Sequence, residues 1–141
     1  MATRSRIAIK HENETIESVY CHWDGYPKGA GATLLKHYTD KEKVAELISL
    51  GSLSVLGQFT KPEDGVEHSF GNPAEEVTIA YHRDRGERLD IKKHYGSILN
   101  FFQSDIEEWG YLFDSATGEW YVGKGENEPG RRQFIPLKDV V

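Results

Sequence analysis

The chain has little of what would direct it out of the cell or into a membrane. Its single cysteine, Cys21, cannot close a disulfide within the chain, which favours a reducing compartment. No run approaches the roughly 18 apolar residues of a membrane span, and the N-terminal residues lack the apolar core of a signal peptide. The histidines are scattered, without the HExxH or CxxC spacing of a metal site. We therefore expect a cytoplasmic protein with no membrane segment, metal or cofactor.

Positive charge is also in short supply. The 141 residues include 17 Lys and Arg against 23 Asp and Glu, a formal net charge of −6. Such a surface repels a phosphate backbone, so we expect no binding to DNA or RNA polymers, although one small anion in a local pocket stays compatible. With 38% apolar residues and the length of one hydrophobic core, residues 1–141 are predicted to form a single domain.

Alternating patterns predict strands at both ends of the chain. Residues 6–10 and 15–23 read as an opening β-hairpin. A second hairpin is predicted at 111–122, with Gly118 at positive φ in its turn, and short strands at 77–81 and 133–135.

Helical spacing of apolar residues predicts helices between these strands. One includes Leu34; the next begins at the capping box Thr39–Glu42 and ends at Gly51; a third spans about 97–108. Residues 57–73, rich in polar residues, are predicted to form a long surface excursion. The whole pattern predicts an α+β fold, with an antiparallel sheet built from hairpins and helices packed on one side.

Arginines gather at two places in this acidic chain. Arg83, Arg85 and Arg88 follow a predicted strand, and Arg131 and Arg132 precede the last one. A guanidinium offers several donors in one plane and suits a phosphate or pyrophosphate. The alternative is a solvated turn in which intervening acidic residues neutralise the arginines.

Aromatic and amide side chains suggest a surface for a base. Phe102 lies on the apolar stripe of its helix, whereas Phe101 lies off it and needs an interface or a ligand to cover it. Asn100 could read the edge of a base. Trp23 and Tyr26 flank a glycine-rich loop that could hold a phosphate but reads first as a structural turn, and Trp23 itself could stack on a base or close the core.

No catalytic constellation can be diagnosed. Cys21 and His22 are neighbours on a predicted strand, so their side chains point to opposite faces. Adjacent carboxylate pairs likewise diverge, and triads are recognised by geometry rather than by order. The residues therefore favour binding over catalysis.

Seven segments together are typical of one known family, and the run His-Trp-Asp-Gly-Tyr-Pro is the most specific part. They are Arg6–Lys10, Ser18–Pro27, Leu34–Val44, Leu47–Gly51, Val77–Glu87, Tyr111–Asp114 and Glu119–Val122. In these segments the chain resembles the Thoeris anti-defence family, first type, a group of phage-encoded signal sponges.

The resemblance implies a ligand-binding domain that acts in the host cell cytoplasm and is not an enzyme. It implies a homo-oligomer, a dimer or a hexamer, that sequesters cyclic ADP-ribose isomers without cleaving them and that can also bind cyclic oligonucleotides between subunits. The ligand contacts we predict rest on side-chain chemistry. They are Arg83, Arg85, Arg131 and Arg132 for pyrophosphate, Trp23 and Phe101 for adenine stacking, and Asn100 for a polar edge.

Two other functions stay open. A nucleotide-signal hydrolase would need a histidine or carboxylate beside the arginines, and His82 and Asp84 are the nearest candidates. A phage inhibitor that binds a host protein directly would use the acidic surface instead.

Overall fold

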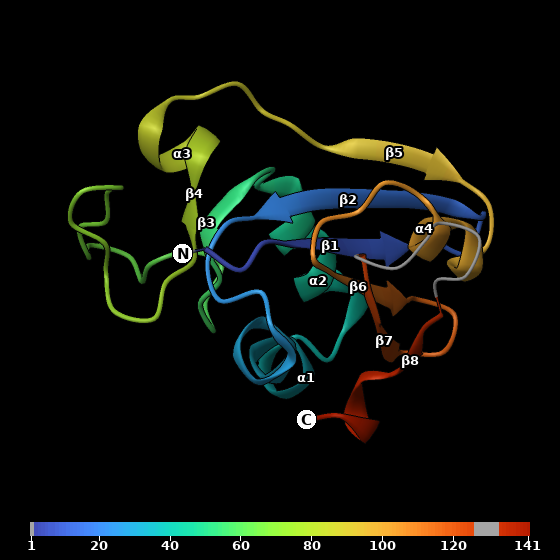
Figure 1. Cartoon of the computed structure of the whole chain (residues 1–141). Coiled ribbons are helices and arrows are strands. Elements are labelled where there is room, and N and C mark those ends of the chain that lie inside the picture. The colour runs from blue at the N-terminus through green and yellow to red at the C-terminus, as the bar shows by residue number, and fades with distance from the viewer. Residues whose placement is uncertain (1, 126–132) are drawn as a thin grey trace.

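The fold is seen in a computed structural model that describes residues 2–125 and 133–141. A twisted sheet runs through the middle of the molecule, and helices cover both of its faces (Figure 1). The strands are β1 (Ser5–Lys10), β2 (Thr15–Cys21), β3 (Leu53–Val55), β4 (Ile79–Ala80), β5 (Lys92–Tyr95), β6 (Trp109–Asp114), β7 (Glu119–Lys124) and β8 (Ile135–Pro136). The helices are α1 (Ala32–His37), α2 (Lys41–Ser49), α3 (Tyr81–Arg85) and α4 (Ile98–Gln103), with short helical turns at Pro27–Gly31 and Leu137–Asp139.

The α+β class and both predicted hairpins are confirmed. β1 pairs with β2 and β6 pairs with β7, each antiparallel, and Gly118 has a φ of +75° in the second turn. The order along the sheet is β4-β3-β2-β1-β6-β7-β8, with β5 on the outer edge of β2. The two hairpins meet through β1 and β6, which run parallel, so the sheet is mixed rather than purely antiparallel. A parallel join is possible because the long segment between the hairpins returns the chain to the starting end of the sheet.

Helices lie on both faces of the sheet, not on one. Ile7 and Ile9 of β1 pack in the cluster that contains α1 and α2, whereas Ala8 between them packs on the opposite face with α4. This follows from the pleat, because successive side chains of a strand point to opposite faces. The second cluster consists of Ala8, Ile16, Phe101, Phe102, Ile106 and Leu112.

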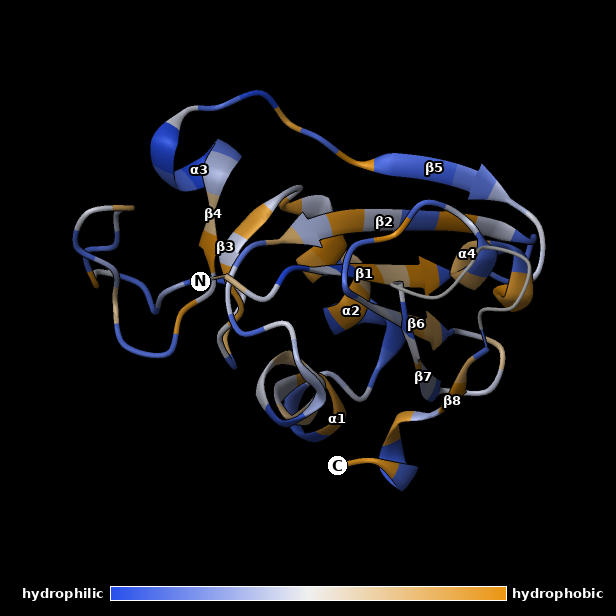
Figure 2. Ribbon diagram, in the orientation of Figure 1, coloured by the Kyte–Doolittle hydropathy of each residue, from blue (hydrophilic) through white to orange (hydrophobic). Residues whose placement is uncertain are grey.

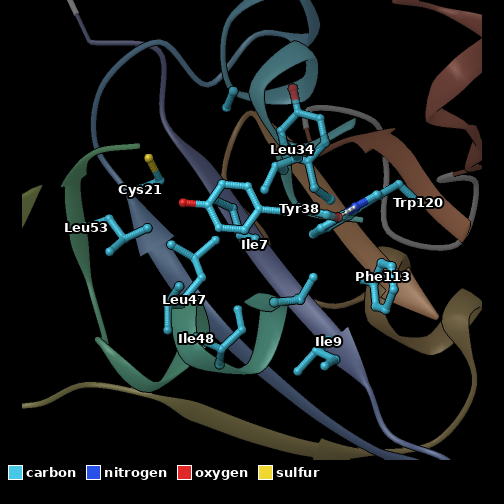
Figure 3. Close-up of a cluster of buried hydrophobic side chains, with 14 of the residues drawn as sticks. Ile7, Ile9, Cys21, Leu34, Tyr38, Leu47, Ile48, Leu53, Phe113 and Trp120 are labelled. Carbon is cyan, nitrogen blue, oxygen red and sulfur yellow. Dashed lines mark hydrogen bonds between the residues drawn. The ribbon is translucent and has the colours of Figure 1, made fainter. Parts of the chain in front are cut away.

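Two hydrogen bonds from aromatic side chains stabilise the larger core (Figure 3). The indole N–H of Trp120 donates to the carbonyl of Tyr38 over 2.8 Å, and the Tyr38 hydroxyl donates to the carbonyl of Gly57 over 2.7 Å. Cys21 is fully buried in this core. Burial raises the pKa of its thiol to about 12, so at neutral pH it is not a thiolate nucleophile.

Helix boundaries differ from the prediction at two points. α2 is capped by Asp40, whose carboxylate accepts from the Lys43 N–H over 2.8 Å, one residue after the predicted Thr39. α4 ends at Gln103, because Ser104 is extended, and Ile106 reaches the second cluster from the loop beyond. The predicted stop at Gly51 is confirmed, with a φ of +77°.

Residues 57–76, called the excursion below, form the predicted long surface segment between β3 and β4. In Figure 1 the excursion extends at the left, beside α3. Figure 2 shows that α3 and β5 are strongly hydrophilic, whereas β1 is hydrophobic. Within the described ranges, no helix is both long and apolar enough to cross a membrane.

Candidate ligand-binding groove

A groove opens where two strands share the outer edge of β2. β5 pairs with Thr15–Ser18, while β3 pairs only at Cys21. The segment 86–91 leaves α3 and crosses to β5 over the interval between, and a groove of about 690 Å³ lies there. It is lined by Tyr20, Ser52, Tyr81, Arg85, Glu87, Arg88, Leu89, Asp90 and Ile91.

Arg85 is held in this groove by aromatic rings. Its guanidinium carbon lies 4.3 Å from the ring centre of Phe70 and 4.9 Å from that of Tyr81. The two rings are themselves 5.6 Å apart at 33°. Arg85 also forms an ion pair with Glu87. The two rings attract the Arg85 guanidinium and limit its orientation. One edge of its N–H donors can therefore bind an anion with a smaller loss of side-chain entropy.

Arg88 and Tyr20 also line the groove. Arg88 is exposed, and none of the acidic side chains in the described part of the chain forms an ion pair with it. The Tyr20 hydroxyl is hydrogen-bonded to Nδ1 of His22 over 2.6 Å. Burial raises the pKa of Tyr20, although the nearby Arg4 guanidinium acts in the opposite direction. The groove thus combines exposed guanidinium donors with phenol rings.

Arg83 does not face the groove but belongs to a buried polar cluster, called the Asp84 hub. Its Nε donates to Asp84 Oδ1 over 2.8 Å, and another nitrogen donates to the carbonyl of Thr78 over 2.7 Å. Asp84 Oδ2 also accepts from the Ala80 N–H at 2.8 Å and faces Nε2 of His68 at 3.1 Å. These protein groups already use the donors of Arg83, so Arg83 is a structural residue. The prediction that Arg83 contacts a pyrophosphate is corrected accordingly.

The predicted contacts at Asn100 and Phe101 also need correction. Phe101 is 1% exposed, because it packs on the second face of the sheet, which the prediction left uncovered. Asn100 caps α4: its side-chain oxygen accepts from the Ser97 N–H over 2.9 Å. Both residues belong to α4, which lies at the end of the molecule opposite to α3 (Figure 1). Neither lines the groove.

Trp23 lies in a different, smaller hollow. Its side chain is 42% exposed beside Tyr26, in a cavity of about 210 Å³. The glycine-rich loop there uses its own amides, since the N–H groups of Gly29 and Ala30 donate to the carbonyls of Tyr26 and Asp24. A Cβ on Gly29 would lie 2.4 Å from the Asp24 carbonyl, so the glycine permits close packing. This geometry favours the structural-turn interpretation over a phosphate-binding loop.

His82 and Asp84, the residues that hydrolysis would require, are occupied elsewhere. Nδ1 of His82 lies 2.7 Å from the carbonyl of Glu87, so this nitrogen donates. Asp84 is bound in its hub, and neither residue lines the groove. Among the residues that the structure describes, no group of three or more His, Cys, Asp or Glu side chains could hold a metal ion.

Of the predicted contacts, Arg85 alone lines the groove, while Arg131 and Arg132 lie outside the described residues. The predicted site residues omitted Tyr20, Tyr81 and Arg88. Tyr81 and Arg88 bracket the arginine run and could have been found from it, whereas Tyr20 carried no signal in the sequence. Comparison with protein-family models, curated proteins and solved structures gave no match.

Proposed function

We propose that the chain binds a cyclic nucleotide signal, of the cyclic ADP-ribose class, and sequesters it without cleaving it. The observation that carries this proposal is the groove beside α3, where Arg85 and Arg88 lie with Tyr20 and Tyr81. The resemblance to the Thoeris anti-defence family also supports it, because Arg85 falls within one of the segments that carry the likeness. In this proposal, capture in the host cytoplasm raises the amount of signal that the host needs to trigger its defence.

The groove suits a ligand with a pyrophosphate and a base. Two guanidinium groups can each share charge-assisted hydrogen bonds with a pyrophosphate. The tyrosine rings offer faces for an adenine, because stacking tolerates any planar ring. A volume of about 690 Å³ lies within the range of small-molecule sites.

The lining residues favour holding over hydrolysis. Glu87 is paired with Arg85, and burial raises the pKa of Tyr20, so that phenol keeps its proton at neutral pH. A hydrolase would need a base aimed at the ligand, and Asp90, the other carboxylate of the lining, is the residue to replace in testing for one. We also propose that a second subunit of a homo-oligomer covers the open side of the groove, which would bury more of the ligand. Arg131 and Arg132 stay candidates for this shared wall.

Calorimetric titration with cyclic ADP-ribose isomers tests the assignment of the groove. We expect Arg85→Ala and Arg88→Ala each to weaken binding about tenfold or more, since each removes charge-assisted hydrogen bonds. Lys138→Ala is the matched control: it removes a positive charge paired with Glu119, away from the groove, and should bind as the wild type does. Equal affinities in all four proteins would contradict the groove assignment.

A further inference from the structure

The excursion is fastened to α3 by a buried polar contact that the binding proposal does not use. The side chains of His68 and Asp84 are each 3% exposed. Arg83 adds a bond from its guanidinium to the carbonyl of Thr60, so the same α3 residue holds the excursion at a second point. The excursion is therefore attached to α3 by hydrogen bonds between polar side chains as well as by packing.

The hydrogen bonds define which nitrogen of His68 carries the proton. The Ala74 N–H donates to Nδ1 over 2.9 Å, so Nδ1 is an acceptor. The remaining nitrogen, Nε2, must carry the hydrogen, and it donates to Asp84 Oδ2 over 3.1 Å. His68 is therefore neutral in this arrangement, with both ring nitrogens satisfied.

Protonation of His68 would weaken this arrangement. The charged groups placed against His68 are Asp84 and Arg83, both on α3; Ala80, on β4, supplies an N–H to the same Asp84 oxygen. A second ring proton would face the Ala74 N–H and abolish that hydrogen bond. It would turn the existing contact with Asp84 into an ion pair, but Arg83 already balances that carboxylate, and the new cation would lie 3.4 Å from an Arg83 nitrogen.

The excursion also carries Phe70, whose ring lies against Arg85 of the groove. Phe70 is two residues from His68, so release of His68 would move the ring that orients Arg85. We propose that the excursion is a pH-sensitive latch, in which neutral His68 fastens it to α3 and Phe70 is a positioning residue that holds Arg85 ready for an anionic ligand. The ligand named here rests on the proposed function, whereas the latch does not.

The latch is tested without any ligand by NMR of the arginine Nε–H groups. In the wild type the Arg85 proton should be shifted by the ring currents of Phe70 and Tyr81, and Phe70→Leu should remove the Phe70 part. Lowering the pH should produce the same change, because a proton on Nδ1 of His68 abolishes the hydrogen bond from the Ala74 N–H. His68→Asn is the control, because its amide oxygen can replace Nδ1 as acceptor without titrating. A wild-type signal that ignores pH, or an equal change in His68→Asn, would overturn the latch.

The positioning role is tested with cyclic ADP-ribose isomers. Phe70→Leu should weaken binding about threefold, and Phe70→Tyr, which keeps a ring over Arg85, should restore it. A merely structural role would lower stability without this rescue. Equal binding by Phe70→Leu and the wild type would overturn the positioning role. If the wild type binds no cyclic nucleotide, the proposed function fails, while the ligand-free spectra still decide the latch.

Discussion

Neighbouring residues of the arginine run have unlike roles. Arg83 and Arg85 are two positions apart, yet one is locked into the Asp84 hub and the other lines the groove. The sequence predicts both as phosphate ligands, because the residue type is the same. It could not separate them, because the separation depends on Thr60, His68 and Phe70 of the excursion, which approach α3 only in the folded chain.

Replacing Asp84 with Asn should be among the most damaging single changes at this end of the fold. It leaves the Arg83 guanidinium without its counter-charge. Because the Arg83 side chain is 27% exposed, the loss should be about 2 kcal/mol, less than for a fully buried pair. Glu87→Gln breaks a pair with Arg85 in which both side chains are half-exposed, and should cost less than about 1 kcal/mol. Urea unfolding measures both. Similar losses in the two variants would contradict the structural role of the hub.

The Asp84 hub also predicts how the free energy of unfolding changes at acidic pH. Burial opposes ionisation of Asp84, but hydrogen bonds from Arg83, Ala80 and His68 outweigh it and hold its pKa below the ordinary value of 3.8. The stabilisation is therefore complete above that value and is lost as the pH falls below it. Urea midpoints measured from neutral pH down to about pH 3 should fall more steeply for the wild type than for Asp84→Asn. Parallel curves would exclude this contribution.

Asn100 gives a direct choice between a ligand contact and a cap. Asn100→Ala should lower the free energy of unfolding by about 1 kcal/mol, because it removes half of the capping box on α4. Its affinity for a cyclic ADP-ribose isomer should equal that of the wild type. Weakened binding at unchanged stability would restore the role that the sequence first suggested.

At the scale of elements, the sequence predicts the strands that have an alternating apolar pattern and misses the short elements made of charged residues. The alternating patterns of β1, β2, β6 and β7 locate four strands correctly. β5 has the sequence Lys-Lys-His-Tyr, which carries no alternation, and its pairing with β2 supplies the strand. α3 is a helix of five residues within a charged run, closed by Gly86 at a φ of +73°. Short polar elements of this kind depend on tertiary contacts rather than on their own propensity.

β5 should loosen as the pH falls through the mildly acidic range. Burial, Arg6 and Lys92 lower the pKa of His94 below 6.5, so the folded state disfavours its charged form. The stabilisation is complete above the unfolded value of 6.5 and is lost below it. Hydrogen exchange of the Lys92–Tyr95 amides, corrected for intrinsic rates, should speed up between about pH 7.5 and about pH 5.5.

His94→Gln is the control for β5, because glutamine does not titrate in this range. The change in protection with pH should disappear in this variant. Persistence of the change would assign it to another group. His68 acts on the excursion rather than on β5, so the two histidines can be separated by the location of the exchange.

At the scale of the whole molecule, the α+β class follows from the sequence, but the site does not. The groove takes residues from β2, from the turn before β3, and from α3 with the segment after it. Phe70 adds a contribution from a fourth segment, the excursion. The parallel join of β1 with β6 is equally invisible in the local pattern, because pairing across about a hundred residues leaves no periodicity. The lining of the groove therefore depends on contacts between segments that are far apart in the sequence.

The net negative charge of the chain excludes fewer ligands once the fold is known. A net charge of −6 opposes binding of a nucleic-acid polymer over a broad surface. Arg85 and Arg88 are nevertheless presented together in one groove. Such a surface can hold a small dianion locally.

Capture and release of one ligand tests the central proposal most directly. The protein is incubated with a cyclic ADP-ribose isomer, freed of unbound ligand and heat-denatured, and the released compound is identified by mass spectrometry and chromatography. We predict stoichiometric release of the intact isomer by the wild type and much reduced release by Arg85→Ala. A linear product in place of the cyclic isomer would make the protein an enzyme, and the absence of any released nucleotide would contradict sequestration.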